Sequence, residues 1–293
     1  MTPAEHSVDA RGLKIHYVEW GEGDAPPLVL VHGFLDHARS WDAFVAALRD
    51  RLARPRRIIA LDCRGHGDSG WVGAGGYYHF PDYILDLDTL IQNLSLPSVS
   101  LLGHSMGGTI AFLYAGTFPR RVEALILVEG MGPRGHSFSA APQRMEQWIT
   151  DVHLLGQRRA VQYANLEKGA ERLRRNNPRL KPDMALHLAR HGMRQTPRGK
   201  WVWKFDPLHR TTSPQPFYAG QAQQFFQRIQ CPALILWGEE SRQLTRREKK
   251  ERLEGLAGET HVTIKNAGHM IHHDNPQDMA QVVAAFLARP IPG

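Results

Sequence analysis

Short apolar runs alternate with amphipathic stretches along the first part of the chain. Residues 13–20 alternate as in a half-buried β-strand. Four largely aliphatic runs have the length of strands buried on both faces: residues 27–31, 57–61, 99–102 and 122–128. Helical periodicity lies between them, over residues 41–52, 83–94 and 106–118. This alternation predicts an α/β fold, with a mostly parallel, doubly wound sheet joined by right-handed crossovers.

The alternation stops after residue 130. Helical patterns follow without a further buried strand, over residues 143–157, 158–175 and 181–191, and then comes a stretch rich in Trp and Pro. The sheet pattern returns later, with strands at residues 233–237 and 261–264 and helices at residues 245–256 and 276–287. We therefore predict a core of residues 1–132 and 227–293, with residues 133–226 inserted as a helical cap or lid. Such an insertion would lie over the carboxyl ends of the strands, where ligands bind in open α/β sheets.

A Gly-His-Ser-Met-Gly segment, residues 103–107, joins a predicted strand to a predicted helix. A serine on so sharp a turn carries its hydroxyl clear of the backbone, and the glycines remove Cβ atoms that would clash as strand and helix approach. The alternative is a glycine-rich turn that only connects two elements. We interpret the segment as a nucleophile elbow, which makes Ser105 a candidate catalytic nucleophile.

A serine that transfers acyl groups needs a base, a carboxylate that holds the base, and donors for the oxyanion. His269, which follows the last predicted strand next to a glycine, is the candidate base. The amide of Met106 begins a helix whose dipole favours negative charge, and it is one candidate oxyanion donor. The amide of Phe34, in the loop after the strand at residues 27–31, is the other; its ring could also line a pocket.

Two strand ends could supply the carboxylate. Glu129 directly follows an apolar run. Burying a carboxylate there is costly unless it has a hydrogen-bonding partner or a function. Glu239 and Glu240 follow the strand at residues 233–237 and remain alternatives. His272 and His273 lie in the same loop as His269, but residues of one loop rarely bind a metal without a distant ligand. The sequence therefore favours Glu129 as the acid and predicts no metal site.

Composition places the chain among globular proteins, because 42% of its 293 residues are hydrophobic. Cys63 and Cys231 show no CxxC spacing, so neither a disulfide framework nor a thiolate metal site is indicated. Residues 1–10 show no basic cluster followed by an apolar stretch, and no segment reaches the roughly 20 apolar residues that span a bilayer. We expect a soluble, cytoplasmic protein in a reducing compartment, without an integral membrane segment. The oligomeric state is left open.

The positive charge is concentrated in one segment. Residues 158–210 contain fourteen Lys or Arg and four Asp or Glu, whereas the net charge of the whole chain is +7. Such a field could attract anionic lipid, nucleic acid or an acidic substrate, or the segment could be a solvated helical surface. No nucleic-acid motif accompanies the charge, so no nucleic-acid partner is predicted.

Four motifs together resemble the α/β-hydrolase fold superfamily over nearly the whole chain: His-Gly-Phe at residues 32–34, the loop at residues 62–69, the elbow at residues 103–108, and Gly-His at residues 268–269. Many members carry the triad aspartate where this chain has Ser241. Some relatives, among them a branch of the haloalkane dehalogenases, place a glutamate after the earlier strand, and Glu129 matches them. Residues 129–133 and 201–207 also look similar to the serine hydrolase-like branch.

The resemblance implies a serine hydrolase of a small-molecule ester, with Ser105 acylated, His269 as base, Glu129 as the orienting acid and no cofactor. Dehalogenases and epoxide hydrolases use an aspartate in place of Ser105 and are disfavoured. A carbon–carbon bond hydrolase, thioesterase, lactonase or cofactor-free peroxidase would use the same triad and remains an alternative. The alternative outside the enzymes is a non-catalytic protein that binds a ligand in the same fold. Candidates to line the substrate pocket are Trp41, Trp201, Trp203 and Phe217.

Overall fold

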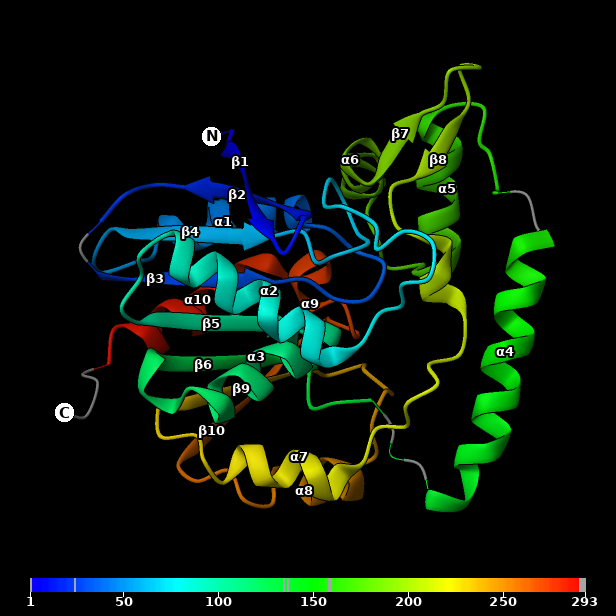
Figure 1. Cartoon of the computed structure of the whole chain (residues 1–293). Coiled ribbons are helices and arrows are strands. Elements are labelled where there is room, and N and C mark those ends of the chain that lie inside the picture. Colours follow the sequence, from blue (N-terminus) through cyan, green and yellow to red (C-terminus); the bar gives the residue numbers. More distant parts are fainter. Residues whose placement is uncertain (1, 24, 134, 136, 158–159, 290–293) are drawn as a thin grey trace.

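The computed structural model describes residues 2–23, 25–133, 135, 137–157 and 160–289. Within these ranges eight strands form one sheet in the order β1-β2-β4-β3-β5-β6-β9-β10 (Figure 1). The strands from β4 to β10 in this order run parallel, whereas β2 pairs antiparallel with both β1 and β4. The mostly parallel sheet confirms the predicted fold class.

The strands of this sheet are Ala4–Ala10 (β1), Leu13–Trp20 (β2), Ala25–Val31 (β3), Arg56–Leu61 (β4), Val99–His104 (β5), Val122–Val128 (β6), Ala233–Gly238 (β9) and Glu259–Ile264 (β10). The helices around it are Asp42–Arg49 (α1), Phe80–Asn93 (α2), Met106–Thr117 (α3), Ala219–Phe226 (α7), Arg246–Leu253 (α8), Ile271–Asp274 (α9) and Pro276–Leu287 (α10). Most agree with the predicted elements. β1, α7 and α9 were not predicted; β1 is mostly exposed and α9 is a single turn.

Both faces of the sheet are covered, and the alternation within β3 shows how. Val29 and Val31 belong to one hydrophobic cluster, together with residues of α2, α3 and α7. Leu28 and Leu30 belong to the other, together with residues of α1 and α10. Since successive side chains of a strand point to opposite faces, a continuous apolar run fits a strand buried on both sides.

The segment inserted between β6 and β9 lies beyond the carboxyl ends of the parallel strands (Figure 1). It contains Phe138–Ala140 (η3), Ala141–Gln157 (α4), Leu166–Asn176 (α5), Pro182–Gly192 (α6), Met193–Gln195 (β7), Trp201–Trp203 (β8) and Pro207–Arg210 (η4). The hairpin of β7 and β8 was not predicted, and its strands have three residues each. The helix predicted over residues 158–175 begins only at Leu166, and residues 158–159 lie outside the described ranges.

The helix α7 falls within the predicted cap but packs against the core. The Phe226 ring stacks on that of Phe112 in α3, with centroids 4.3 Å apart. The predicted boundary at residue 226 therefore assigns α7 to the cap, although its packing joins it to α3 of the core. None of the helices in the described ranges combines the length and the hydropathy that crossing a bilayer requires.

Candidate active site

Ser105 stands in a strained turn between β5 and α3. Its φ of 50° and ψ of −111° lie outside the regions that side-chain-bearing residues normally adopt. The packing around the turn explains its glycines. A Cβ at Gly107 would overlap the main-chain oxygen of Val31, and a Cβ at Gly108 would lie 2.5 Å from Cα of Gly130. The glycines thus allow α3 to make direct backbone contact with the end of β3 and with the segment after β6.

The hydroxyl of Ser105 is hydrogen-bonded to an imidazole. Nε2 of His269 lies 3.0 Å from Oγ of Ser105. The other ring nitrogen, Nδ1, lies 3.5 Å from Oε2 of Glu129. These three side chains come from the ends of β5, β10 and β6, which are distant in sequence and converge at one edge of the sheet. A hydroxyl, an imidazole and a carboxylate thus stand in series, which is the geometry of a catalytic triad.

The carboxylate of Glu129 is held on both oxygens. The Gly238 amide donates to Oε1 at 2.8 Å, and the Ser241 hydroxyl donates to Oε2 at 2.8 Å. The side chain is 1% exposed, and the residue has a φ of 52°. Ser105 and Glu129, which both have unusual backbone conformations, therefore directly follow two neighbouring strands, β5 and β6.

The alternative acids point elsewhere. Glu240 forms an ion pair with Arg179. Glu239 is exposed, and its Oε2 lies 3.4 Å from the amide nitrogen of Asn266. Neither has an interaction with His269 in the part of the chain that the structure describes. Of the three glutamates considered from the sequence, the structure brings only Glu129 to the imidazole.

The loop after β3 passes beside Ser105. A Cβ built on Gly33 would lie 3.5 Å from Cβ of Ser105, so the next residue, Phe34, lies near the hydroxyl. Met106 is the first residue of α3. Within the described ranges, the amides of Phe34 and Met106 have no acceptor inside the protein. Two free N–H groups next to a serine are the donors that an oxyanion needs.

A histidine within the elbow supports the loop that carries the base. Nε2 of His104 donates to the main-chain oxygen of His269 at 2.9 Å. Burial, with the neighbouring His272 and His269, holds the pKa of His104 well below its usual range, so the ring is neutral. Sequence reasoning missed His104 and also the support from Ser241. The position of His104 inside the elbow, at the end of a buried strand, was the available signal.

Behind this loop lies a buried carboxylate among histidines. Asp36 lies 3.4 Å from Nε2 of His272 and 3.5 Å from Nε2 of His273. Burial would raise the pKa of the Asp36 carboxyl, but the hydrogen bond with His272 and the charges of His273 and His37 lower it well below its usual range. The three ligand atoms could hold a metal ion. Asp36, in the loop after β3, is a carboxylate close to these histidines that the sequence analysis did not consider, and the prediction of no metal site stays a prediction.

A cavity of about 630 Å³ opens at Ser105 between the sheet edge and the inserted segment. Ser105, His269, Phe34, Met106 and Phe217 all line it. The other three pocket candidates do not. Trp41 is completely buried, with its ring 4.4 Å from that of His272. Trp201 and Trp203 pack within the inserted segment, around Tyr163. Of the four candidates, the structure therefore brings only Phe217 to the cavity.

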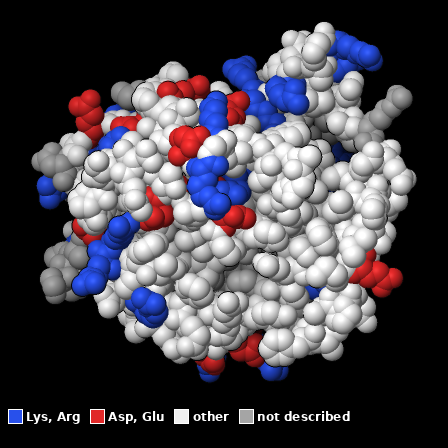
Figure 2. Space-filling model, in the orientation of Figure 1, with Lys and Arg blue, Asp and Glu red and all other residues white. Residues whose placement is uncertain are grey.

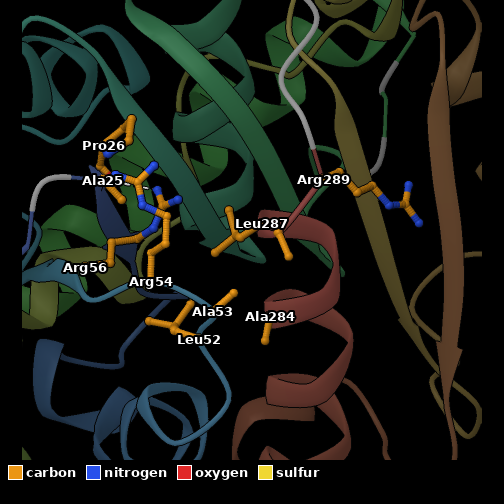
Figure 3. Close-up of a pocket in the computed structure, with 10 residues that line it drawn as sticks. Ala25, Pro26, Leu52, Ala53, Arg54, Arg56, Ala284, Leu287 and Arg289 are labelled. Carbon is orange, nitrogen blue, oxygen red and sulfur yellow. Dashed lines mark hydrogen bonds between the residues drawn. The ribbon is translucent and has the colours of Figure 1, made fainter.

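A second cavity, of about 360 Å³, lies at the opposite ends of the strands. Figure 3 shows Ala25, Pro26 and Arg56, at the start of β3 and β4, facing Ala284 and Leu287 of α10. None of the candidate catalytic residues lines this cavity. We therefore assign no part of the Ser105 site to it.

Comparison with known proteins identifies the family. A family described as alpha/beta hydrolase fold matches residues 26–276 of the chain. The chain belongs to the α/β hydrolase fold family. This confirms the resemblance predicted from the motifs, and the residues that match include the elbow, the strand end that carries Glu129 and the loop that carries His269.

Relatives of this α/β hydrolase are known over most of its length. A serine hydrolase-like protein of Dictyostelium discoideum is 27% identical over 94% of this chain and 79% of its own. An sn-1-specific diacylglycerol lipase of Mus musculus is 27% identical over 97% of this chain and 88% of its own. The crystal structure of a hypothetical protein of Pseudomonas aeruginosa PAO1 is similar with a TM-score of 0.86 and 31% identity, over 97% of this chain and 99% of that one.

Proposed function

We propose that the protein hydrolyses carboxylic esters of small molecules through a Ser105–His269–Glu129 triad. The observation that carries the proposal is the 3.0 Å contact between Oγ of Ser105 and Nε2 of His269, continued by Glu129 at Nδ1. A hydroxyl that faces an imidazole is activated as a nucleophile when a carboxylate fixes the opposite ring nitrogen. Membership of a family with hydrolase and lipase relatives supports the same conclusion.

In the first half of the reaction, Oγ of Ser105 attacks the ester carbonyl carbon while its proton passes to Nε2 of His269. The carbonyl oxygen becomes an oxyanion, which accepts hydrogen bonds from the Phe34 and Met106 amides. Glu129 stabilises the imidazolium at Nδ1. The C–O bond to the alcohol then breaks, and the departing oxygen takes the proton from Nε2. The result is the free alcohol and an acyl ester of Ser105.

In the second half, water replaces the alcohol. It gives one proton to Nε2 of His269 and attacks the acyl carbon, and a second oxyanion forms at the same two amides. The bond to Oγ breaks, Oγ regains the proton from Nε2, and the carboxylic acid leaves. The protein's own groups supply nucleophile, base and oxyanion donors, so the proposed reaction needs no cofactor.

The inserted segment acts in this proposal as a cap. Leu208, Ser213 and Phe217 line the cavity opposite Ser105, so the segment contributes much of the wall that an acyl group contacts. Apolar walls with a few polar groups are typical of pockets for small molecules. The shape of this segment, rather than the triad, would therefore select the substrate.

The test is hydrolysis of p-nitrophenyl acetate and butyrate by the purified protein and by Ser105→Ala. We expect the wild type to turn over both esters and the variant to lose at least about 10³-fold of kcat, because the nucleophile is removed. A fluorophosphonate probe should label the wild type and not the variant. A wild type that neither turns over esters faster than Ser105→Ala nor reacts with the probe would favour a non-catalytic ligand-binding protein.

A further inference from the structure

Asp36, His272 and His273 form a buried group of side chains that the proposed reaction does not use. Asp36 lies in the loop after β3, and both histidines belong to α9. None of the three side chains is more than 7% exposed. None of them lines the Ser105 cavity either, so a substrate in that cavity does not contact them. Their arrangement therefore needs an explanation other than contact with an ester.

The distances within this group are longer than those of ordinary hydrogen bonds. Oδ2 of Asp36 lies 3.4 Å from Nε2 of His272 and 3.5 Å from Nε2 of His273. Nitrogen and oxygen atoms that share a hydrogen bond are usually about 2.7–3.2 Å apart. Two ligands of a tetrahedral zinc ion, each about 2.0–2.1 Å from the metal, are about 3.3–3.4 Å apart. The two distances therefore fit ligands that share one metal ion.

An unpartnered nitrogen of His273 is the second observation that points to a ligand. Nε2 of this buried ring has no hydrogen-bond partner among the described residues. Burial, with the neighbouring His272, holds the pKa of His273 well below its usual range, so the ring is neutral and offers a lone pair. Oδ1 of Asp36 accepts from the His37 amide at 3.0 Å. This bond orients the carboxylate so that Oδ2 faces the two histidines.

Two other groups of histidine and carboxylate side chains have their ligand atoms already engaged. Nδ1 of His16 lies 2.7 Å from Oδ2 of Asp62, as in a direct hydrogen bond. In the other group, the Arg39 side chain donates to both carboxylate oxygens of Asp42 at 2.7–3.0 Å. Nε2 of His187, which belongs to the same group, lies 2.9 Å from the main-chain oxygen of Arg39. Hydrogen bonds within the protein therefore satisfy these two groups, in contrast to the buried group on α9.

Positive charge also opposes a metal ion at the group of Asp42. Its third member is His191, and burial together with the charge of Arg39 lowers the pKa of this ring to about 3. Figure 2 shows Lys and Arg side chains gathered at the top right of one face, where Figure 1 places α6, the helix that carries His191. At His273, by contrast, the carboxylate of Asp36 attracts positive charge. Of the three groups in the described part of the chain, the one on α9 thus suits a cation best.

We propose that Asp36, His272 and His273 bind a divalent metal ion of the zinc class. Two imidazoles and one carboxylate are a ligand set that zinc takes in proteins, with water in the fourth position. Ca²⁺ and Mg²⁺ prefer oxygen ligands alone and fit this set poorly. The sequence predicted no metal site because it showed no ligand outside the loop of the histidines, and Asp36 is such a ligand.

A bound ion would join two loops of the candidate active site. Asp36 lies two residues after Phe34, which carries a candidate oxyanion donor. The two histidines lie three and four residues after His269. The ion takes no part in the proposed ester hydrolysis, because none of its ligands lines the Ser105 cavity. It holds the loop of the oxyanion donor against the loop of the base.

The experiment measures metal bound to the full chain, produced without a polyhistidine tag. Cells are grown with added Zn²⁺, so that the ion is present while the chain folds and slow entry into a closed site does not matter. After gel filtration, inductively coupled plasma mass spectrometry gives the zinc content per chain. A second culture is grown with Co²⁺, whose visible absorption is much stronger in tetrahedral than in octahedral coordination. The variants are His273→Gln and Asp36→Asn, with His191→Gln as the control from the group of Asp42.

We expect about one zinc ion per chain in the wild type and in His191→Gln, and less than about 0.2 in the other two variants. Loss of a ligand should weaken metal binding by at least about 100-fold, because changes beyond the ligands already cost about 10- to 100-fold. The Co²⁺ protein should show the absorption of a tetrahedral site, and His273→Gln should lose it.

Less than about 0.2 zinc ions per wild-type chain would overturn the inference, and so would zinc that His273→Gln and Asp36→Asn leave in place. Zinc lost from His191→Gln alone would move the site to the group of Asp42 and overturn it as well. Circular dichroism shows whether the variants fold. If they do not, X-ray absorption of the zinc-loaded wild type decides, since the inference requires two imidazoles bound to the metal. These measurements do not use ester hydrolysis, so the inference and the proposed function can fail independently.

Discussion

Oγ of Ser241 donates a hydrogen bond of 2.8 Å to Oε2 of Glu129. Many α/β hydrolases carry their triad acid at the position of Ser241, after β9. Here the carboxylate comes from the end of β6, the neighbour of β9 in the sheet. The Ser241 hydroxyl, at the position where those relatives carry the acid, therefore binds the carboxylate that contacts His269.

Glu129→Gln should lower kcat for ester hydrolysis by about 10³- to 10⁴-fold. An amide cannot stabilise the imidazolium, and its NH₂ group favours the wrong tautomer of His269. The matched control is Glu240→Gln, which removes a carboxylate from an exposed ion pair with Arg179 and should change kcat less than about twofold. Steady-state kinetics of the two variants decide the assignment. The opposite order of effects would move the acid to β9.

The double variant Glu129→Gln/Ser241→Asp should recover at least about tenfold of the activity that Glu129→Gln alone loses. The aspartate would place a carboxylate next to the position that Oε2 of Glu129 occupies, and the glutamine could donate to it. Ser241→Asp in the presence of Glu129 should be less active than the wild type, because two carboxylates would then share one buried space. Equal kcat values for Glu129→Gln and the double variant would contradict this account.

Position at a strand end explains why part of the site could be predicted. Ser105, Glu129 and His269 each follow a recognisable strand, and strands of a parallel sheet bring their carboxyl ends to one edge. The sequence favoured Glu129 over Glu240, but only side-chain directions show which of the two contacts His269. Those directions depend on the hydrogen bonds of Gly238 and Ser241, which no local pattern encodes.

The pocket could not be predicted in the same way. Trp41 begins a predicted helix, whereas Phe217 follows the stretch rich in Trp and Pro. Both are large aromatic residues, yet Trp41 is completely buried in the core and Phe217 lines the cavity. Their locations depend on how the inserted segment packs over the sheet, which is tertiary information. The hairpin of β7 and β8 was missed for a related reason, since three-residue strands are too short to show a period of two.

Gly108→Ala should destabilise the fold by about 1–3 kcal/mol and reduce activity. The added methyl group would overlap backbone atoms of Gly130, which can move only if the packed backbone shifts. Gly130 follows Glu129 directly, so a shift there disturbs the acid. Gly220→Ala in α7 is the control. A Cβ at Gly220 has no neighbour within 4 Å, and the change should stabilise the helix by about 0.5–1 kcal/mol. Urea denaturation measures both, and equal effects would refute the proposed backbone contact.

Several buried histidines make stability depend on pH. Burial holds the pKa of His66 well below its usual range, and neighbouring His209 and His32 lower it further. Burial also lowers the pKa of His209 to about 4. The rings of His66 and His209 lie 4.1 Å apart, and Nε2 of each is buried without a partner among the described residues. A proton on either ring would therefore be poorly stabilised in the folded protein.

The free energy of unfolding should fall as the pH decreases from about 6.5 towards 4. In this window the unfolded chain binds protons on histidines that the folded protein keeps neutral, and each such group costs up to about 1.4 kcal/mol per pH unit. Carboxylates whose pKa is lowered in the folded protein, such as Asp36, also lose their stabilising contribution as the pH falls, but only below the unfolded pKa of about 4. His209→Phe, which keeps a ring in the stack, should reduce the slope between pH 6 and 4.5 relative to the wild type. His153 is exposed, so His153→Gln should leave the slope unchanged. Urea denaturation at several pH values measures the slope for each variant. Equal slopes for His209→Phe and the wild type would contradict this account.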